Sequence, residues 1–386
     1  MSFTVNVAVC GRFHYHNYIP FLAQEDFLKS FYYSHRFDRK ILKDHPEKEV
    51  NLWLKEYLRV LHSKVFGTKY QDSLFYAYLL LWEKGVLKHW RKADLWHLLL
   101  HGTALKILQR AKNEGSLTLG EAVNAHPLVV FQILSEEEER LSLPRRQRLW
   151  KAAQRLLEEL KEIDFLLVPS NWVKKSFIQE GFPEEKIQIL HYGVNVSRFK
   201  PSQSKDNVFR VICVAQITPR KGQVYLLEAW KKLKLPHAEL CLAGKIDPVM
   251  IPLLSRYNGL FRYLGYSSHE KVASFYQNAS VYVLPTLEDG FAVSCLEAMA
   301  SGLPVVTTDQ NGASDVIKHG VNGFVVPIRS PEKIAYYLEL LYTHPGLCRE
   351  MGEKAAYDAQ HCYNWESYAR KLVKIYEEIM GVKICP

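Results

Sequence analysis

The chain lacks the features that mark secreted, membrane-spanning or disulfide-stabilised proteins. Its seven cysteines are scattered without a CxxC pair, and an odd count in 386 residues argues against a disulfide framework and predicts reduced thiols. The longest apolar run, residues 74–82, is too short to cross a bilayer. Residues 1–11 contain no basic lead followed by an apolar core, so we expect no secretion signal and a cytoplasmic location.

Recognition motifs for nucleic acid and for metal ions are missing as well. The sequence contains no zinc-finger spacing, no RNP-like aromatic motif and no long Lys/Arg run, which argues against the common nucleic-acid-binding modules. It also contains no DxD cluster and no histidines at metal-ligand spacing beside a carboxylate. We therefore expect no nucleic-acid partner, no metal and no resident cofactor.

Positive charge is in excess, and most of it lies in the first half of the chain. The net charge is +9, and residues 1–200 carry 30 Lys and Arg against 23 Asp and Glu. A basic surface attracts an anionic membrane or a phosphate-bearing acceptor, although a generally basic surface also explains the excess. Residues 75–90 mix aromatic and basic side chains, which fits either peripheral docking at the inner membrane face or a buried helix.

The rest of the sequence has the composition of a folded α/β protein. Hydrophobic residues make up 48%, and the length exceeds what one core usually serves, so we expect two domains. Short apolar runs alternate with helical stretches in both halves, which predicts two doubly wound parallel sheets. The predicted strands are residues 5–10, 95–100, 119–124, 165–168, 209–215, 239–243, 262–264, 281–284 and 304–307, and the long helices of the first half are residues 50–64 and 143–162.

The expected domain boundary is the polar, turn-rich segment of residues 199–207. This boundary separates an N-terminal domain of residues 1–200 from a second domain of residues 201–364, and residues 365–386 contain a final amphipathic helix. The acidic run of residues 136–139 is expected to be a solvated helix start.

Residues 285–306 carry the most chemical information. An apolar strand leads into an acidic loop around Asp289, and a helical stretch from Phe291 follows before the next strand. Ligands of open α/β sheets bind outside the carboxyl ends of the strands, and helix N-termini attract phosphate and sugar oxygens. A helix through Asp289 and Glu297 would put both on nearly the same face. Such carboxylates accept hydrogen bonds from a ribose or sugar diol, with an N-cap Asp and a solvated Glu as the alternative.

This segment resembles the acidic signature of family-four glycosyltransferases, in which two acidic residues flank seven others before an Ala-Met-Ala-x-Gly helix end. The resemblance spans nearly all of residues 164–330 and implies a GT-B fold, with two Rossmann-like domains facing each other across a cleft. It implies that Glu297 holds the ribose of the donor nucleotide and that either Asp289 or Glu288 contacts the donor sugar. The donor-binding residues that it implies are Glu288, Asp289, Gly290, Phe291, Ala292, Val293 and Glu297.

Two cations follow the first strand of the second half. Arg220 and Lys221 can neutralise a diphosphate, and Lys221 resembles the phosphate-binding lysine of the family's Lys-Gly motif. The arginine that usually precedes this motif is absent, with Ala215 and Gln216 in its place, so Arg220 is the candidate substitute. With these cations in the role of a metal ion, we expect metal-independent donor binding.

The first half offers a second group of candidates. Gly11 follows the first strand and either lets the backbone approach the donor closely or simply forms a turn. The resemblance implies a histidine that faces the donor sugar from the end of a first-domain strand, and His126 fits this position best, followed by His101. Aromatic and hydrogen-bonding side chains after the first strand suit an acceptor sugar or headgroup, although their spacing is also typical of packing. The candidate acceptor contacts are Phe13, His14, Tyr15, His16 and His101.

The function expected from the resemblance is retaining transfer of a hexose-type sugar from a nucleoside diphosphate sugar to a hydroxyl acceptor, which is a glycan, a lipid-linked molecule or a small molecule. The resemblance also implies that the final helix crosses back onto the first domain. Two alternatives stay open: a sugar-nucleotide epimerase or hydrolase that uses His126 and Asp289, and a non-catalytic nucleotide-sugar-binding protein. The expected catalytic residues are His126, Asp289, Lys221 and Arg220.

Overall fold

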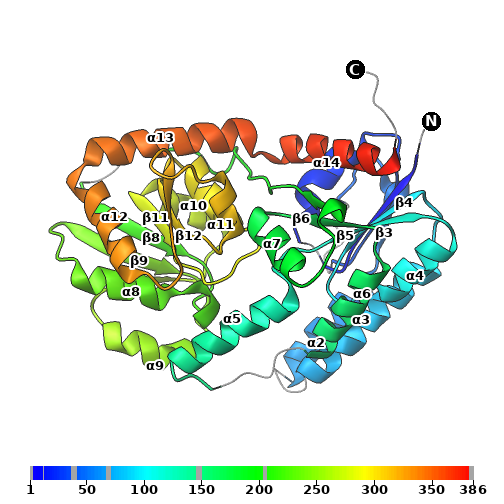
Figure 1. Ribbon diagram of the computed structural model, residues 1–386, viewed down its shortest axis with the longest axis horizontal. Helices are drawn as coiled ribbons and strands as arrows, with labels where there is room; N and C mark the ends of the chain where they lie inside the picture. The colour runs from blue at the N-terminus through cyan, green and yellow to red at the C-terminus, as the bar shows by residue number, and fades with distance from the viewer. Residues whose placement is uncertain are drawn as a thin grey trace.

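The chain folds into two α/β lobes in a computed structural model that describes residues 3–11, 13–35, 41–66, 71–144, 150–202 and 207–381. Figure 1 shows the lobes side by side, each with a sheet enclosed between helices. Each lobe contains one parallel sheet, so the predicted pair of doubly wound domains is confirmed. We call them the first lobe, built on strands β1–β7, and the second lobe, built on strands β8–β13.

The sheet of the first lobe has seven strands in the order β3-β2-β1-β4-β5-β6-β7. The order reverses between β1 and β4, which is where open sheets form their binding crevice. Every residue of these two central strands is buried, as expected for strands covered on both faces. The strands are β1 (Val5–Val9), β2 (Leu28–Tyr33), β3 (Glu49–Asn51), β4 (Leu95–Leu99), β5 (Leu117–Glu121), β6 (Phe165–Val168) and β7 (Ile187–Ile189).

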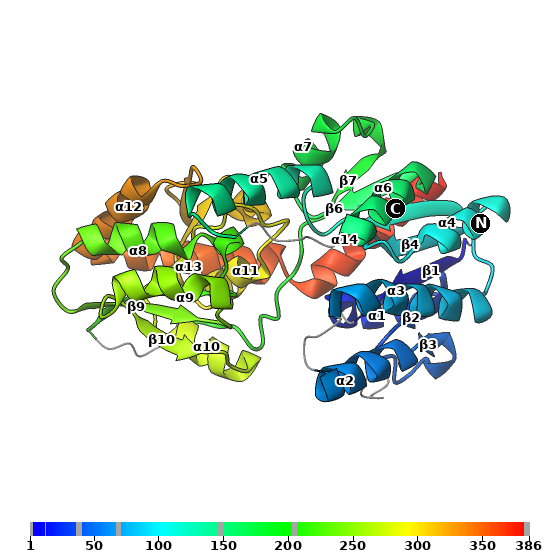
Figure 2. The ribbon, with the colours of Figure 1, turned by 90° about the horizontal axis from the view of Figure 1, so that it is seen from below.

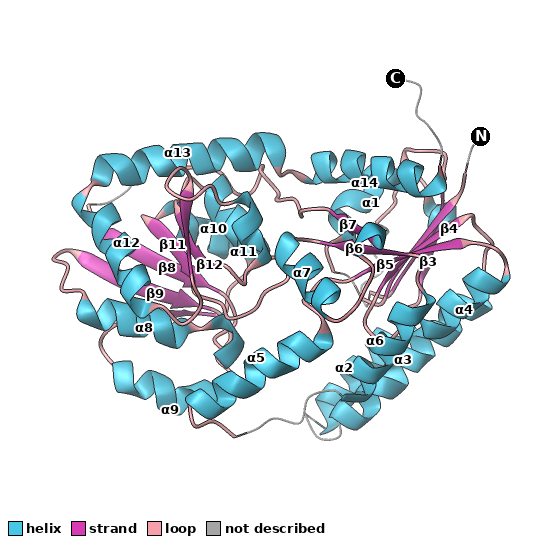
Figure 3. Ribbon diagram, viewed as in Figure 1, coloured by secondary structure: helices cyan, strands magenta, loops and turns pink. Residues whose placement is uncertain are grey.

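Helices cover both faces of this sheet, as the secondary-structure colouring in Figure 3 shows. Val7 and Val9 of β1 pack in one core with α1 and the C-terminal helix, whereas Ala8 packs in the opposite core with α3 and α4. This alternation follows from the two-residue period of a strand. The helices of the first lobe are α1 (Tyr15–Ala23), α2 (Leu54–Phe66), α3 (Gln71–Lys88), α4 (Leu105–Asn113), α5 (Pro127–Arg140), α6 (Trp150–Glu162) and α7 (Asn171–Gln179).

The sheet of the second lobe has six strands in the order β10-β9-β8-β11-β12-β13. Its order reverses between β8 and β11, so the loops after these two strands lie next to each other. The strands are β8 (Phe209–Val214), β9 (Ala238–Ala243), β10 (Arg262–Gly265), β11 (Val281–Leu284), β12 (Val305–Thr308) and β13 (Gly323–Val326). The helices are α8 (Gln223–Lys232), α9 (Ile251–Leu254), α10 (His269–Gln277), α11 (Val293–Ala300), α12 (Pro331–Thr343) and α13 (Pro345–Cys362).

The final helix, α14 (Trp365–Met380), crosses from the second lobe onto the first (Figure 1). Asn364 caps its start by accepting a hydrogen bond from the Ser367 N–H at 2.8 Å, and Gly381 ends it in the left-handed region at φ +65°. The helix packs against α1. The Tyr376 hydroxyl lies 2.7 Å from His97 Nδ1, in the centre of the first sheet.

Helix α5 extends in the opposite sense, from the end of β5 toward the second lobe (Figure 2). Its C-terminal turn contains the acidic run of residues 136–139, and Glu137 and Glu138 are buried. The expectation of a solvated helix start is therefore wrong, because this turn packs against the second lobe.

Several predicted boundaries also differ from the observed ones. The helix predicted over residues 143–162 begins at Trp150 as α6, and residues 145–149 lie outside the described chain. The predicted helix 50–64 begins later because residues 49–51 pair with β2 as an edge strand. The strand predicted over residues 119–124 is shifted to Leu117–Glu121, so Asn124 lies in the following loop. Strands β2, β3, β7 and β13 were not predicted.

Residues 75–88 belong to helix α3, which packs one side into the lobe and exposes Lys84 and Lys88, and contact of this segment with a membrane stays a prediction. Trp82 is buried on α3, and the Trp90 ring stacks on Trp96 with centroids 4.2 Å apart. Among the described residues, no helix is long and apolar enough to cross a bilayer. The six cysteines of the described chain are all free thiols.

Candidate functional site

The acidic loop between β11 and α11 is fixed by its neighbour, the loop after β12. The Asp289 N–H donates to the Gln310 carbonyl at 3.0 Å, and the Gly312 N–H donates to the Asp289 carbonyl at 2.8 Å. The Asn311 side chain accepts a hydrogen bond from the Ala292 N–H at 3.1 Å. Helix α11 begins at Val293, so Asp289 precedes it and a helix through Asp289 and Glu297 does not exist. The expected placement of both on one helix face is wrong.

Lys221 reaches this loop from the end of β8. It ends a 3₁₀ turn, Pro219–Lys221, and Gly222 follows at φ +65°. A side chain at Gly222 would overlap the Pro285 carbonyl, so the glycine lets the two loops pack directly together. The Lys221 ammonium consequently forms an ion pair with the Asp289 carboxylate.

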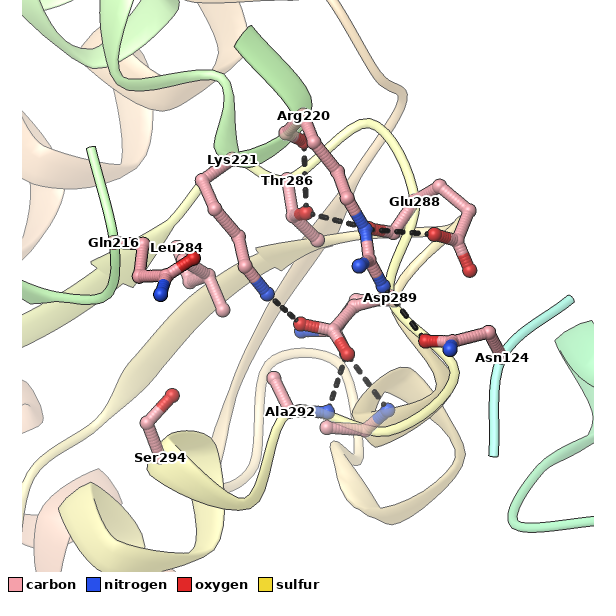
Figure 4. Close-up of polar contacts among 12 residues, drawn as sticks. Asn124, Gln216, Arg220, Lys221, Leu284, Thr286, Glu288, Asp289, Ala292 and Ser294 are labelled. Carbon is pink, nitrogen blue, oxygen red and sulfur yellow. Dashed lines mark hydrogen bonds and ion pairs between the residues drawn. The ribbon is translucent and has the colours of Figure 1, made fainter. Parts of the chain in front are cut away.

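The environment of Asp289 favours its charged form. Burial raises the pKa of this carboxyl, but the Lys221 and Arg220 cations and a hydrogen bond from the Phe291 backbone more than offset that effect. The pKa of Asp289 therefore lies below its usual value. Figure 4 shows side chains from the loops after β8 and β11, from the end of β11 and from the start of α11 pointing toward one space. They belong to Gln216, Lys221, Leu284, Asp289 and Ser294.

Arg220 and Glu288 lie on the other side of the same loops, at the contact with the first lobe. Arg220 Nε lies 2.8 Å from the Glu288 carboxylate, and its Nη2 donates to the Asn124 side chain at 2.9 Å. The Glu288 carboxylate also accepts from the Ala125 N–H at 3.3 Å. Glu288 is fully buried, and burial raises its pKa although Arg220 acts against that rise. Of the two adjacent acids, Asp289 is the one beside Lys221.

Gly290 brings the backbones of the two lobes close together. A Cβ on Gly290 would overlap the Val123 carbonyl of the first lobe. The Gly290 carbonyl accepts a hydrogen bond from the Ser170 hydroxyl at 2.8 Å, and Gly312 packs directly behind it. The small residue thus serves contact between the lobes, whereas contact with a donor sugar stays a prediction.

Glu297 follows Gly290 in the sequence and lies on helix α11. In the described chain its carboxylate accepts one hydrogen bond, from the Tyr276 hydroxyl at 3.4 Å. Burial raises the pKa of Glu297 to about 7, with Tyr276 and Arg198 acting in the opposite direction. A half-buried carboxylate with so few donors is suited to accept hydrogen bonds from a ligand diol. No observation tests its assignment to a ribose.

His126 does not join the group around Lys221. Its ring meets Phe177 edge-on, with centroids 5.1 Å apart, and lines a pocket of about 420 Å³ with Phe177 and Glu180. Burial lowers its pKa. His101 is exposed after β4, and Gly11 lies in the turn after β1 at φ +125°, with open space where a side chain would be. Contact of these three with a donor or acceptor stays a prediction.

The candidate acceptor contacts after β1 mostly pack within the protein. Tyr15 is fully buried and donates to Glu121, and its contact with an acceptor stays a prediction. His14 stacks on Trp365 of α14 with centroids 5.5 Å apart, and Phe13 packs against His14. His16 Nδ1 lies 2.8 Å from the Phe13 carbonyl. The packing alternative describes this segment better.

Sequence reasoning missed three residues that shape the site. Asn124 receives Arg220 from the facing lobe, Asn311 holds the start of α11, and Ser170 binds the Gly290 carbonyl. Their positions directly after strands β5, β12 and β6 were the available signal. In the described chain, no three His, Cys, Asp or Glu side chains are placed to hold a metal ion. Metal independence stays a prediction.

Part of the chain, including the second lobe, is similar in sequence to known glycosyltransferases. Residues 195–358 match the family model described as glycosyl transferases group 1. The chain is 28% identical over 222 residues to an uncharacterized glycosyltransferase of Methanocaldococcus jannaschii. This alignment covers 52% of this chain and 56% of that protein. The sequence match thus spans about half the length of the curated relatives.

Solved structures share the complete two-lobed fold. Sucrose-phosphate synthase from Thermosynechococcus elongatus superposes with a TM-score of 0.73 at 16% identity, over 97% of this chain and 99% of that chain. HepE of Anabaena, in complex with UDP, superposes with a TM-score of 0.68 at 14% identity, over 97% and 100% of the chains. At these identities the likeness concerns the fold, and the expected GT-B architecture is confirmed.

Proposed function

We propose that the chain transfers a hexose-type sugar from a nucleoside diphosphate sugar to a hydroxyl acceptor, a proposal supported by the match of residues 195–358 to the glycosyl transferases group 1 model. The observation that carries the proposal is Lys221 paired with Asp289 at the carboxyl ends of β8 and β11, beside the start of α11. A cation and a helix N-terminus together suit a diphosphate. The shared fold with HepE, solved with UDP, supports a nucleotide-sugar donor.

In the proposed reaction, Lys221 stabilises the negative charge that grows on the leaving diphosphate. Without a donor, this ammonium is neutralised by Asp289. A bound diphosphate would take over the cation and leave Asp289 to accept hydrogen bonds from sugar hydroxyls. Glu297 would bind the ribose diol, which suits its half-buried carboxylate.

We propose retention of the anomeric configuration without a protein nucleophile. The bond between the anomeric carbon and the phosphate oxygen breaks, and the acceptor oxygen bonds to that carbon on the same face. The acceptor proton passes to the departing phosphate oxygen, which balances the charge on the leaving group. Because Lys221 supplies the positive charge, the step proceeds without a divalent cation, and EDTA should leave the rate unchanged.

An epimerase or hydrolase receives less support from the geometry. Its acid–base pair would be His126 and Asp289, but His126 packs on Phe177 while Asp289 pairs with Lys221. A complete conversion of donor to epimer or free sugar without acceptor would reverse this preference.

Thermal-shift screening with UDP-, GDP- and ADP-sugars tests the proposal, because a ligand of the folded state raises the melting temperature. We expect one donor to stabilise the protein and Lys221→Ala to remove that shift. Lys232→Ala is the matched control, since it deletes an exposed lysine that pairs with Glu332 on the surface. The absence of a shift with every donor would contradict the proposal.

Product analysis tests the stereochemistry. With the donor so identified and an acceptor panel, NMR of the product should show the anomeric configuration of the donor. An inverted product or a trapped glycosyl-enzyme would overturn the proposed retention while leaving sugar transfer itself intact.

A further inference from the structure

Helix α2 turns three ionisable residues toward the protein and several large apolar residues toward solvent. Lys55, Glu56 and His62 are all buried. Lys55 Nζ lies 2.6 Å from the Glu56 carboxylate and 3.2 Å from Cys10 Sγ at the end of β1. A surface helix of a globular protein normally shows the reverse arrangement, so α2 calls for a partner on its outer side.

Five large apolar residues, each 46–61% exposed, lie along the outward side of this helix and at the residue that precedes it; Phe66 is exposed as well but lies outside this arc. A spacing of four residues advances about 40° around a helix, so positions 53 to 65 cover an arc of about 120°. Figure 2 shows α2 at the periphery of the first lobe, where it packs against α3. We call these residues the α2 face: Trp53, Leu54, Tyr57, Leu61 and Val65.

The charges beside the α2 face point to the kind of partner. The only carboxylate of α2 is Glu56, which is buried and paired with Lys55 and Arg59. The exposed charged side chains of the helix are Arg59 and Lys64, both cationic, and Lys64 lies within the apolar arc by its position. Apolar side chains combined with cations and no exposed carboxylate match the boundary between the anionic headgroups and the acyl chains of a bilayer.

We propose that the α2 face docks the first lobe onto an anionic lipid bilayer. The aromatic and aliphatic side chains would enter the headgroup–acyl boundary, and Lys64, within the same arc, would lie at lipid phosphates. The first 200 residues supply a net charge of +7 that draws the lobe to such a surface. This surface differs from residues 75–90, where α3 is packed into the lobe.

Flotation with lipid vesicles tests the proposal on the full chain. At low salt we expect binding to phosphatidylcholine vesicles that contain about 30 mol% phosphatidylglycerol and little binding to pure phosphatidylcholine. A triple variant, Tyr57→Asp, Leu61→Asp and Val65→Asp, should bind at least about tenfold more weakly. The matched control places the same three charges on exposed apolar positions of the second lobe: Ile251→Asp, Tyr336→Asp and Tyr357→Asp.

Equal vesicle binding by the two triple variants would overturn the proposal, because the weaker binding would then follow from the three added negative charges and not from their position on the α2 face. No binding of the unmodified chain to anionic vesicles would overturn it as well. If light scattering then showed a dimer that only the α2 variant dissociates, the face would be a contact between copies of the chain. Circular dichroism and melting temperature establish that each variant is folded.

Trp53 provides a measurement that needs no disruptive variant. Its fluorescence should shift to shorter wavelength when anionic vesicles are added, and the shift should be lost in Trp53→Phe. A vesicle-induced shift that persists in Trp53→Phe would contradict insertion of the α2 face. Neither experiment requires a donor or an acceptor, so failure here leaves the proposal of sugar transfer untouched.

Discussion

Arg220 and Lys221 are neighbours in the chain and face different partners. Lys221 points to Asp289 and the space beside α11, whereas Arg220 joins Glu288 to Asn124 of the first lobe. Exchanging arginine and lysine would affect the two positions differently. The guanidinium of an arginine binds two partners at once, whereas the ammonium of a lysine acts as a point charge.

Removal of Arg220 should destabilise the protein. Arg220→Ala leaves the Glu288 carboxylate buried without its cation, which we expect to cost about 3 kcal/mol in chemical denaturation at pH 8. The loss should shrink at pH 5, because the raised pKa of Glu288 rises further and the neutral acid tolerates burial. Lys232→Ala is again the control, and an Arg220→Ala loss that does not depend on pH would contradict the role of Glu288.

Glu297 should affect stability and ligand binding in opposite directions with pH. Its folded-state pKa of about 7 exceeds its usual value of 4.5, so the folded protein loses stability as the pH rises between these values. Glu297→Gln should therefore raise the melting temperature at pH 8 and have little effect near pH 4. An equal shift at both pH values would contradict the raised pKa.

Donor binding should depend on the ionised form of the same residue. Below pH 7, donor affinity of the unmodified protein should fall by up to about tenfold per pH unit, because protonation removes the acceptor of the ribose hydroxyls. Glu297→Gln should bind the donor weakly and without this pH dependence. Isothermal titration calorimetry between pH 5 and pH 8 measures both, and a parallel pH profile in the two proteins would contradict the assignment.

Among the elements, α5 contacts the second lobe through a buried carboxylate. Glu137 accepts hydrogen bonds from the Tyr225 hydroxyl at 2.8 Å and from Arg329 Nε at 2.9 Å, both from the second lobe. Arg329 adopts a left-handed backbone at φ +56°, a conformation that costs energy for a residue with a side chain. The buried carboxylate holds that residue in place.

Truncation of Glu137 should loosen this contact. Glu137→Ala leaves the Tyr225 hydroxyl and the Arg329 guanidinium without their acceptor, which we expect to cost about 2–3 kcal/mol. Glu139→Ala, at an exposed position two residues later, should change stability by less than about 0.5 kcal/mol. Equal denaturation midpoints for the two variants would show that the contact contributes nothing.

The elements also show what the sequence permits one to predict. The strand at residues 281–284 was located correctly because four buried apolar residues stand between turn signals. Strand β3 was missed because its three residues are half-buried and sit at the edge of the sheet. The approach of Lys221 to Asp289 follows from adjacent strands β8 and β11, so both residues were found as candidates. The burial of Glu288 and the direction of His126 depend on how the lobes and the turn after β5 pack, which periodicity does not encode.

For the molecule as a whole, Gly290 sets how closely the lobes approach. Gly290→Ala should force the Val123 carbonyl away, since the added carbon would overlap it. A displacement of about 1 Å at a reacting centre can reduce turnover about 100-fold. We expect a loss of that order in kcat/KM with the donor and acceptor identified above, together with a larger radius of gyration in X-ray scattering. Gly346→Ala, on α13 with open space around it, is the control, and unchanged kinetics of Gly290→Ala would contradict a closed working state.

The lobes exchange helices: α5 leaves the first to bind Tyr225 and Arg329, and α14 returns to place Tyr376 against His97. This arrangement limits how the chain can be recombined with its relatives. In a chimera that joins the lobes of two relatives near residue 200, α5 and α14 would each pack against a lobe from a different protein. A functional chimera would have to carry Glu137 together with its second-lobe partners Tyr225 and Arg329, and Tyr376 together with His97. The two lobes therefore have to be kept together in a chimera, even though each lobe has a complete sheet of its own.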